Sequence, residues 1–119
     1  YAGVKDILIL GGTIAAVGEK LKADFGGQVE VQIIDAEGMT AVPGFVDSHE
    51  HILGGGGEGG FHTRTPEAFL GDLIRNGVTT VVGCIGTDGV GRDMNALLAK
   101  VHGLEEEGII VLSILIFYR

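Results

Sequence analysis

The chain has 119 residues, enough for about one domain, and 45% are hydrophobic, although its 22 glycines far exceed the usual share of about 7%. The formal net charge of −8 argues against a nucleic-acid partner, because such a partner requires a basic patch. The longest apolar run, residues 109–118 interrupted by Ser113, is too short to span a bilayer, so we expect no membrane partner.

Residues 1–42 have the pattern of a small β unit. Two apolar runs, Asp6–Leu10 and Thr13–Val17, flank Gly11-Gly12, and this arrangement predicts a tight hairpin because the turns that match strand twist need positive φ. The partial alternation of Val29–Asp35 predicts a third strand, and Thr40–Val42 a short fourth one.

From Phe45 onward the pattern changes to strands that alternate with helices. Phe45–Asp47 is predicted to be a short buried strand. A helix is expected to start with Thr65 as its N-cap and Pro66 at its first position, and to end at Asn76-Gly77. The apolar stripe of this helix consists of Phe69, Leu70, Leu73 and Ile74. Val78–Val82 then predicts a buried strand of the parallel type.

A second helix and a third strand complete this series. Asp93 is suited to cap the helix, which ends before Gly108, and Ile109–Phe117 is apolar enough for a buried strand. The expected apolar face of the helix consists of Met94, Leu97, Leu98, Val101 and Leu104. Three strands and two helices in this order predict an α/β fold, the first three-eighths of a (β/α)8 barrel. A whole barrel needs about 250 residues, so we expect residues 43–119 to be its N-terminal portion.

Cys84 is the one cysteine in the chain and lies in an apolar run, which predicts a buried, unreactive thiol rather than a nucleophile. A single cysteine cannot form an internal disulfide and is typical of the reducing cytoplasm, where we expect the protein to be located.

His49 and His51 stand two residues apart at the end of the first predicted barrel strand. On a strand, this spacing places both imidazoles on one face, with Cα atoms about 6.6 Å apart, and both can then bind one metal ion. On a helix the same spacing would point them about 200° apart. Asp47 falls on the same face of the strand. Two exposed histidines at a strand end remain the alternative for this short pattern taken alone.

Residues 54–60 form a glycine-rich loop directly after the histidine pair. A phosphate-binding loop is disfavoured, because Gly-Lys-Ser/Thr is missing and Glu58 would repel phosphate. A plain flexible linker remains open. The third interpretation is a ligand-binding loop, in which Glu58 captures a substrate ammonium and the glycines let main-chain N–H groups approach a carboxylate.

The segment Pro43-Gly44-Phe45-Val46-Asp47-Ser48-His49-Glu50-His51 resembles the first barrel strand of the amidohydrolase superfamily, Pro-Gly-x-x-Asp-x-His-x-His. Within the superfamily, the chain is similar to the isoaspartyl (β-aspartyl) dipeptidases. That closer similarity rests on three further segments: Gly54 to Glu58, Thr63-Arg64-Thr65-Pro66-Glu67, and Val82-Gly83 with Gly86-Thr87-Asp88.

The resemblance implies zinc-dependent hydrolysis of isoaspartyl dipeptides by two zinc ions that bridge a water. His49 and His51 would hold one ion, Glu58 would bind the substrate α-amino group, and Gly56 and Thr87 its α-carboxylate. Tyr118 would be catalytic and hydrogen-bond the scissile carbonyl. The same resemblance implies that residues 1–42 are part of a small β-sandwich domain and that the remaining ligands follow on later strands, so we expect these 119 residues alone to be inactive.

The sequence also indicates roles for other residues and leaves other functions open. His62 and His102 are expected to be surface residues, and Arg64 to anchor the loop rather than bind substrate. A cyclic-amide hydrolase of the dihydropyrimidinase or dihydroorotase type shares the His-x-His strand, and a truncated, non-enzymatic product is a further alternative. We expect the complete protein to be a homo-oligomer whose partner is a small dipeptide.

Overall fold

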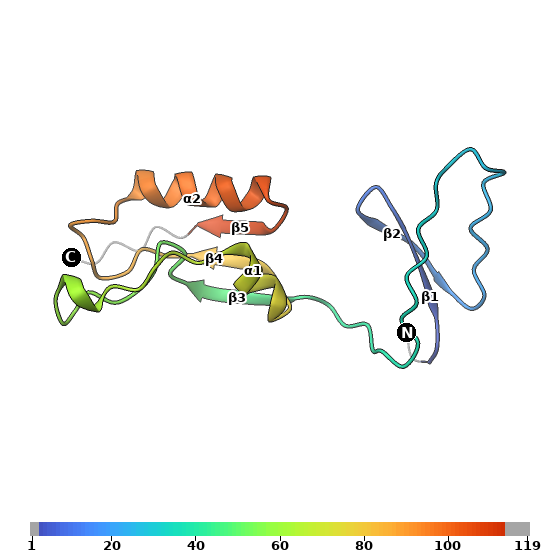
Figure 1. Ribbon diagram of the computed structural model, residues 1–119, viewed down its shortest axis with the longest axis horizontal. Coiled ribbons are helices and arrows are strands. Elements are labelled where there is room, and N and C mark those ends of the chain that lie inside the picture. The colour runs from blue at the N-terminus through green and yellow to red at the C-terminus, as the bar shows by residue number, and fades with distance from the viewer. Residues whose placement is uncertain (1–2, 114–119) are drawn as a thin grey trace. The chain divides into compact units, whose positions relative to one another are not determined.

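The computed structural model describes residues 3–113, which form two compact units, one up to Thr40 and one from Ala41 onward (Figure 1). The first unit contains one antiparallel hairpin, made of β1 (Asp6–Leu10) and β2 (Thr13–Gly18). Gly11 and Gly12 form its turn with φ of 56° and 76°, in the left-handed region that glycine adopts without strain. The predicted hairpin is therefore confirmed.

The two further strands predicted for the first 42 residues were wrong. Residues 28–44 contain no strand, so neither Val29–Asp35 nor Thr40–Val42 forms one. Ile33 and Ile34 are 87% and 78% exposed. Alternating apolar residues become a strand only when a neighbouring strand accepts their main-chain hydrogen bonds, and the described hairpin offers them none.

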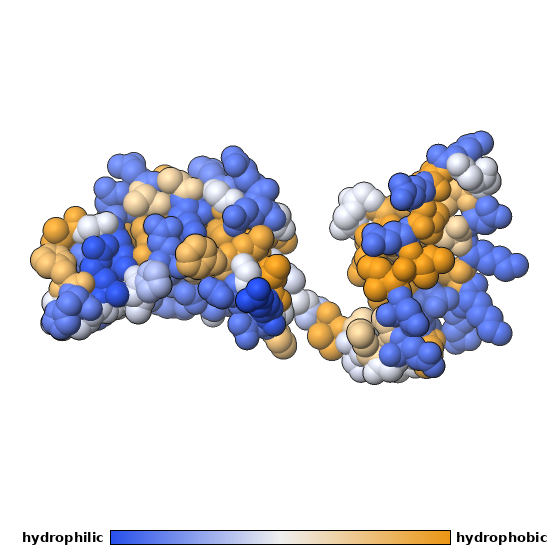
Figure 2. Space-filling view, viewed as in Figure 1, coloured by the Kyte–Doolittle hydropathy of each residue, from blue (hydrophilic) through white to orange (hydrophobic). Residues whose placement is uncertain are grey.

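Apolar side chains of the first unit remain largely exposed. In Figure 2 they gather into a patch on the visible face of this unit, which is the blue and cyan part of Figure 1. The large hydrophobic residues that are exposed here include Ile7, Ile9, Leu10, Ile14, Ile33, Ile34 and Met39. A two-stranded hairpin has little area with which to cover such residues.

The second unit is an α/β structure with a three-stranded parallel sheet, as the alternation of strands and helices predicted. The strands are β3 (Phe45–Glu50), β4 (Val78–Gly83) and β5 (Ile110–Ser113), paired in the order β3-β4-β5. Two helices connect them, α1 (Leu70–Arg75) and α2 (Met94–Glu106), and a 3-10 turn, η1 (Phe61–Thr63), precedes α1. Residues from both helices join one buried cluster against the sheet, so the two crossovers cover the same face.

Helix α2 matches its prediction closely. Asp93 caps it, because its Oδ1 accepts a hydrogen bond of 2.9 Å from the Ala96 amide. Leu97, Val101 and Leu104 are buried, as predicted, whereas Leu98 is 42% exposed. The cluster that these side chains join consists of Ile52, Leu53, Leu73, Val81, Leu97, Val101, Leu104, Ile109 and Val111.

Helix α1 begins at Leu70 with Phe69 as its N-cap, so the predicted start at Thr65 and Pro66 was wrong. The Thr65 hydroxyl is occupied elsewhere, because it accepts a hydrogen bond of 2.7 Å from the Gly55 amide. The chain before α1 therefore runs extended along the glycine-rich loop. Of the predicted stripe only Leu73 is buried, while Phe69 and Ile74 are 63% and 53% exposed.

Strand β3 is less buried than predicted. Phe45 and Val46 are 62% and 64% exposed, since β3 lies at an edge of the described sheet. The side chains of strand β5 alternate between buried and exposed, with Val111 buried and Ile110 and Leu112 exposed. The predicted continuation of this strand to Phe117 lies outside the described residues. None of the described helices is long and apolar enough to cross a membrane.

These exposed apolar residues predict how the 119-residue chain behaves when it is produced alone. We expect it to self-associate and to bind a hydrophobic dye, because exposed apolar patches and unpaired strand edges favour association. Size-exclusion chromatography and thermal melting provide the test. A monodisperse monomer with one cooperative transition and no dye binding would contradict this expectation.

Candidate functional site

The two predicted metal-binding histidines come together at the carboxyl end of β3. The ring centroids of His49 and His51 lie 5.1 Å apart, with the rings perpendicular to each other. His49 is exposed and His51 is half-buried. The alternation of the strand therefore places both rings on one side of β3, as a shared metal ion requires.

A main-chain carbonyl faces one nitrogen of His51. Nδ1 of His51 lies 3.4 Å from the carbonyl oxygen of Cys84, just after β4. A carbonyl can only accept, so this hydrogen bond requires a proton on Nδ1, and in the neutral imidazole the lone pair is then on Nε2. Metal-binding histidines are commonly oriented in this way, because an acceptor binds the N–H of the ring nitrogen that does not bind the metal.

Two carboxylates lie near the pair. Asp47 Oδ1 accepts a hydrogen bond of 3.0 Å from the His49 amide. Burial raises the pKa of Glu50, and the negative charge of Asp47 raises it further. Among residues 3–113, no three histidine, cysteine or acidic side chains are grouped so that they could hold a metal ion. The histidines thus fit two positions of a metal site, with no third protein ligand among the described residues.

Glu58 and Thr87 are brought together although 29 positions separate them in the sequence. The Thr87 hydroxyl, on the loop after β4, donates a hydrogen bond of 2.7 Å to Glu58 Oε1, on the loop after β3. This hydrogen bond is the main cause that lowers the pKa of Glu58. Because both side chains are exposed, the pair presents an ionised carboxylate to solvent beside the carboxyl ends of the strands.

Gly56 lies where no other residue fits without a change in the loop. Its φ is +74°, and a Cβ atom here would overlap the carbonyl oxygen of Thr63. The neighbouring Gly57 amide donates to the Thr63 hydroxyl at 3.2 Å. Main chain of Thr63 therefore packs directly against Gly56, an approach that is possible only because glycine has no side chain.

Two buried charged residues that the sequence analysis missed organise the loops. Asp88 is 7% exposed, and its pKa is lowered, first by the hydrogen bond from the Gly91 amide. Its Oδ2 pairs with Arg64 Nε at 2.8 Å, which confirms that Arg64 anchors the loop. Arg92 is 6% exposed and donates to Gly55 O at 3.0 Å and to Thr65 O at 2.7 Å. The sequence does offer a signal for Asp88, because an aspartate before Gly-Val-Gly is typical of a turn. It offers no such signal for Arg92.

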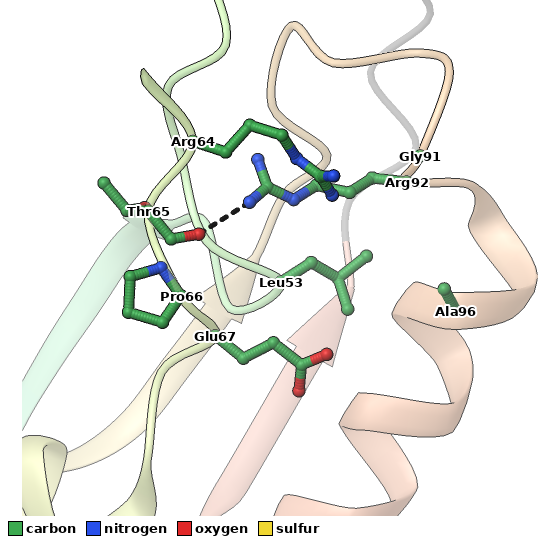
Figure 3. A pocket seen from close by; sticks show the side chains of 8 residues that line it. All are labelled: Leu53, Arg64, Thr65, Pro66, Glu67, Gly91, Arg92 and Ala96. Carbon is green, nitrogen blue, oxygen red and sulfur yellow. Dashed lines mark hydrogen bonds between the residues drawn. The ribbon is translucent and has the colours of Figure 1, made fainter. Parts of the chain in front are cut away.

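Figure 3 shows the cavity beside these arginines, about 350 Å³ in volume. Arg64 and Arg92 lie along one side of it, Thr65 and Pro66 along another, and Ala96 belongs to the first turn of α2. The dashed line in the figure marks the hydrogen bond from Arg92 to the Thr65 carbonyl.

His62 and His102 are exposed, as expected. Cys84 is 1% exposed and burial raises the pKa of its thiol, as expected of an unreactive cysteine. Tyr118, the predicted catalytic residue, lies outside the described residues.

Comparison with known proteins identifies the family. Residues 32–101 match the model of the amidohydrolase family. This chain belongs to that family. Two curated amidohydrolase relatives are the dihydroorotase of Elusimicrobium minutum, 46% identical over 66% of this chain, and the adenine deaminase of Bacillus velezensis, 39% identical over 65%.

A solved structure is similar to nearly the whole chain. The β-aspartyl dipeptidase of Fervidobacterium islandicum AW-1, crystallised with the dipeptide β-Asp-Leu, superposes with a TM-score of 0.84 and is 48% identical over 95% of this chain. The chain spans 29% of that dipeptidase, 16% of the dihydroorotase and 11% of the adenine deaminase.

The hydrogen bond between Thr87 and Glu58 predicts a pH effect. The hydroxyl stabilises the ionised carboxylate, so Thr87→Val should raise the pKa of Glu58, and the side chain should then protonate at higher pH. Titration of the Glu58 carboxyl carbon by NMR measures this shift. Thr79→Val, at an exposed position on β4, is the matched control. An unchanged Glu58 titration in Thr87→Val would contradict the assignment.

Proposed function

We propose that the complete protein hydrolyses the β-aspartyl amide bond of isoaspartyl dipeptides. The observation that carries the proposal is the Glu58–Thr87 pair beside the glycine-rich loop. Glu58 provides a carboxylate that can bind an ammonium group, and Thr87 a hydroxyl that can bind a carboxylate. These are the two charged groups on the α-carbon of an isoaspartyl residue. The 48% identity to a β-aspartyl dipeptidase supports the same substrate class.

Substrate binding would change the partners of this pair. A hydroxyl has one proton to donate, and in the free protein Thr87 donates it to Glu58. When a substrate ammonium donates to Glu58, the Thr87 hydroxyl is released and turns to the substrate α-carboxylate. In the loop, the amides of Gly55 and Gly57 already donate to the hydroxyls of Thr65 and Thr63, so the amide of Gly56 is the further donor that we propose for the carboxylate. Glu58 would thus bind the α-ammonium group and Thr87 the α-carboxylate of the same residue.

His49 and His51 are the residues of this chain that would hold a metal ion, with Nε2 of His51 free for coordination. Zn²⁺ is the ion we propose, as part of a binuclear centre in the complete protein. When bound, it supplies a water of lowered pKa and polarises the scissile carbonyl. Tyr118 is proposed to donate a hydrogen bond to that carbonyl, and the parallel sheet to be the start of a (β/α)8 barrel. A homo-oligomer is proposed for the complete protein.

Cyclic-amide hydrolysis is the second candidate, because the dihydroorotase of E. minutum is 46% identical over 66% of this chain. The full-length gene product should be assayed with β-Asp-Leu, dihydroorotate and hydantoin side by side. Turnover of β-Asp-Leu alone is the expected result. Turnover of a cyclic amide without turnover of the dipeptide would overturn the proposal in favour of the second candidate.

The role of Glu58 predicts a loss of activity in Glu58→Gln. The amide keeps the shape but loses the charge that binds the ammonium, so kcat/KM for β-Asp-Leu should fall about 10- to 150-fold. Glu106→Gln, at the exposed end of α2, removes the same charge elsewhere and should leave kcat/KM unchanged. If Glu58→Gln retains the parental kcat/KM, Glu58 does not bind the substrate ammonium.

The role of the histidines predicts metal loss. His49→Ala and His51→Ala should each deplete bound metal in the full-length gene product, as measured by elemental analysis after dialysis. His102→Ala, an exposed histidine on α2, is the control. The 119-residue chain alone should bind zinc weakly, since two imidazoles are fewer than the three or four protein ligands of a stable site. Stoichiometric zinc on the dialysed chain would contradict this prediction.

A further inference from the structure

The guanidinium of Arg92 connects two loops that are distant in sequence. It lies at the end of the loop after β4, yet its two terminal nitrogens donate to carbonyls of Gly55 and Thr65, 37 and 27 positions away. A buried charge is unfavourable unless it is well hydrogen-bonded, and Arg92 is 6% exposed. Its buried charge is thus placed against main chain of the glycine-rich loop and of the extended segment after it (Figure 3).

The Gly55 carbonyl that Arg92 holds is itself part of a small ladder. Gly55 and Thr65 exchange main-chain and side-chain hydrogen bonds, with Thr65 N to Gly55 O at 3.0 Å and Gly55 N to Thr65 Oγ1 at 2.7 Å. Arg92 binds a carbonyl on each side of this ladder. It therefore fixes the base of the loop that leads through Gly56 to Glu58.

The ion pair of Arg64 with Asp88 is a second connection between the same loops. Asp88 directly follows Thr87, and its two oxygens bind the amides of its own turn and the Arg64 guanidinium. Arg64 directly follows Thr63, whose hydroxyl binds the Gly57 amide. The Glu58–Thr87 pair thus lies near two cross-links between the loops, one through Arg92 and one through Arg64.

We propose that Arg92 is a positioning residue for substrate recognition, which acts through the glycine-rich loop on Glu58. The inference rests on the proposed function. Glu58 is exposed and stands in a glycine run, so burial does not hold it in place. Its 2.7 Å hydrogen bond with Thr87 can form only when the loop after β3 and the loop after β4 stay at a fixed distance from each other. Arg92 supplies that constraint from the core side, where both of its terminal nitrogens bind carbonyls of the chain itself.

Kinetic measurements with two substrates distinguish a positioning role of Arg92 from a general loss of structure in the variant. β-Asp-Leu carries the α-amino group that Glu58 binds, whereas N-succinyl-leucine has the same amide without that group. The selectivity ratio is kcat/KM for β-Asp-Leu divided by kcat/KM for N-succinyl-leucine. In the full-length gene product, Arg92→Lys should lower this ratio about tenfold, mainly because KM for β-Asp-Leu rises. A lysine keeps the charge but lacks the planar fork that reaches two carbonyls at once. Arg92→Gln should lower the ratio at least as far.

Arg75→Gln, at the exposed end of α1, is the matched control and should leave the ratio unchanged. Bound metal should stay at the parental level in all three variants, because His49 lies on β3 and His51 directly follows it. An equal fall of kcat/KM for both substrates, or a parental ratio in Arg92→Lys and Arg92→Gln, would overturn the positioning role.

Hydrogen exchange tests the constraint without any substrate. If the full-length gene product does not turn over β-Asp-Leu, the proposed function fails, and exchange still decides whether Arg92 holds the loop. The hydrogen-bonded amides of Gly55, Gly57 and Thr65 should exchange at least about tenfold faster in Arg92→Lys than in the parent, while amides of α2 should not change. Parental exchange at these three amides would overturn the inference.

Discussion

The packing of helices α1 and α2 against one face of the parallel sheet is the constraint on which the second unit depends. Ile52, Val81 and Leu97 are each 0% exposed and belong to the same cluster. Ile52 directly follows the histidine pair, and its carbonyl accepts a hydrogen bond from Ala68, before α1. The core thus fixes the direction in which the chain leaves β3, and the site residues project from that fixed point.

Much of this arrangement could be predicted from the sequence where the signals are local. The hairpin followed from two adjacent glycines between apolar runs, and the start of α2 from Asp93, because a turn or a cap involves residues only a few positions apart. The histidine pair followed from the period of a strand. The resemblance assigned Glu58 and Thr87 to one predicted site, and the fold brings the two side chains into hydrogen-bond contact.

What could not be predicted depends on partners far away in the chain. Thr65 has the sequence context of a helix cap, yet its hydroxyl binds Gly55, ten positions earlier, and α1 starts later. Val29–Asp35 has the composition of a strand, but a strand also needs a neighbour that composition does not reveal. An arginine that donates to two distant carbonyls, as Arg92 does, has no sequence pattern, because the acceptors are main-chain atoms that every residue carries.

The loop around Gly56 has a consequence for how this part of the site can evolve. A surface made of main chain presents the same amide groups whatever the side chains are, and at Gly56 the overlap with the Thr63 carbonyl resists the addition of a side chain. For the substrate site that we propose, variation in selectivity is then confined to the few positions that do present side chains, such as Glu58 and Thr87. Homologues that acquired a different substrate would have had to change those positions or remodel the whole loop, so changes of specificity here should be abrupt rather than gradual.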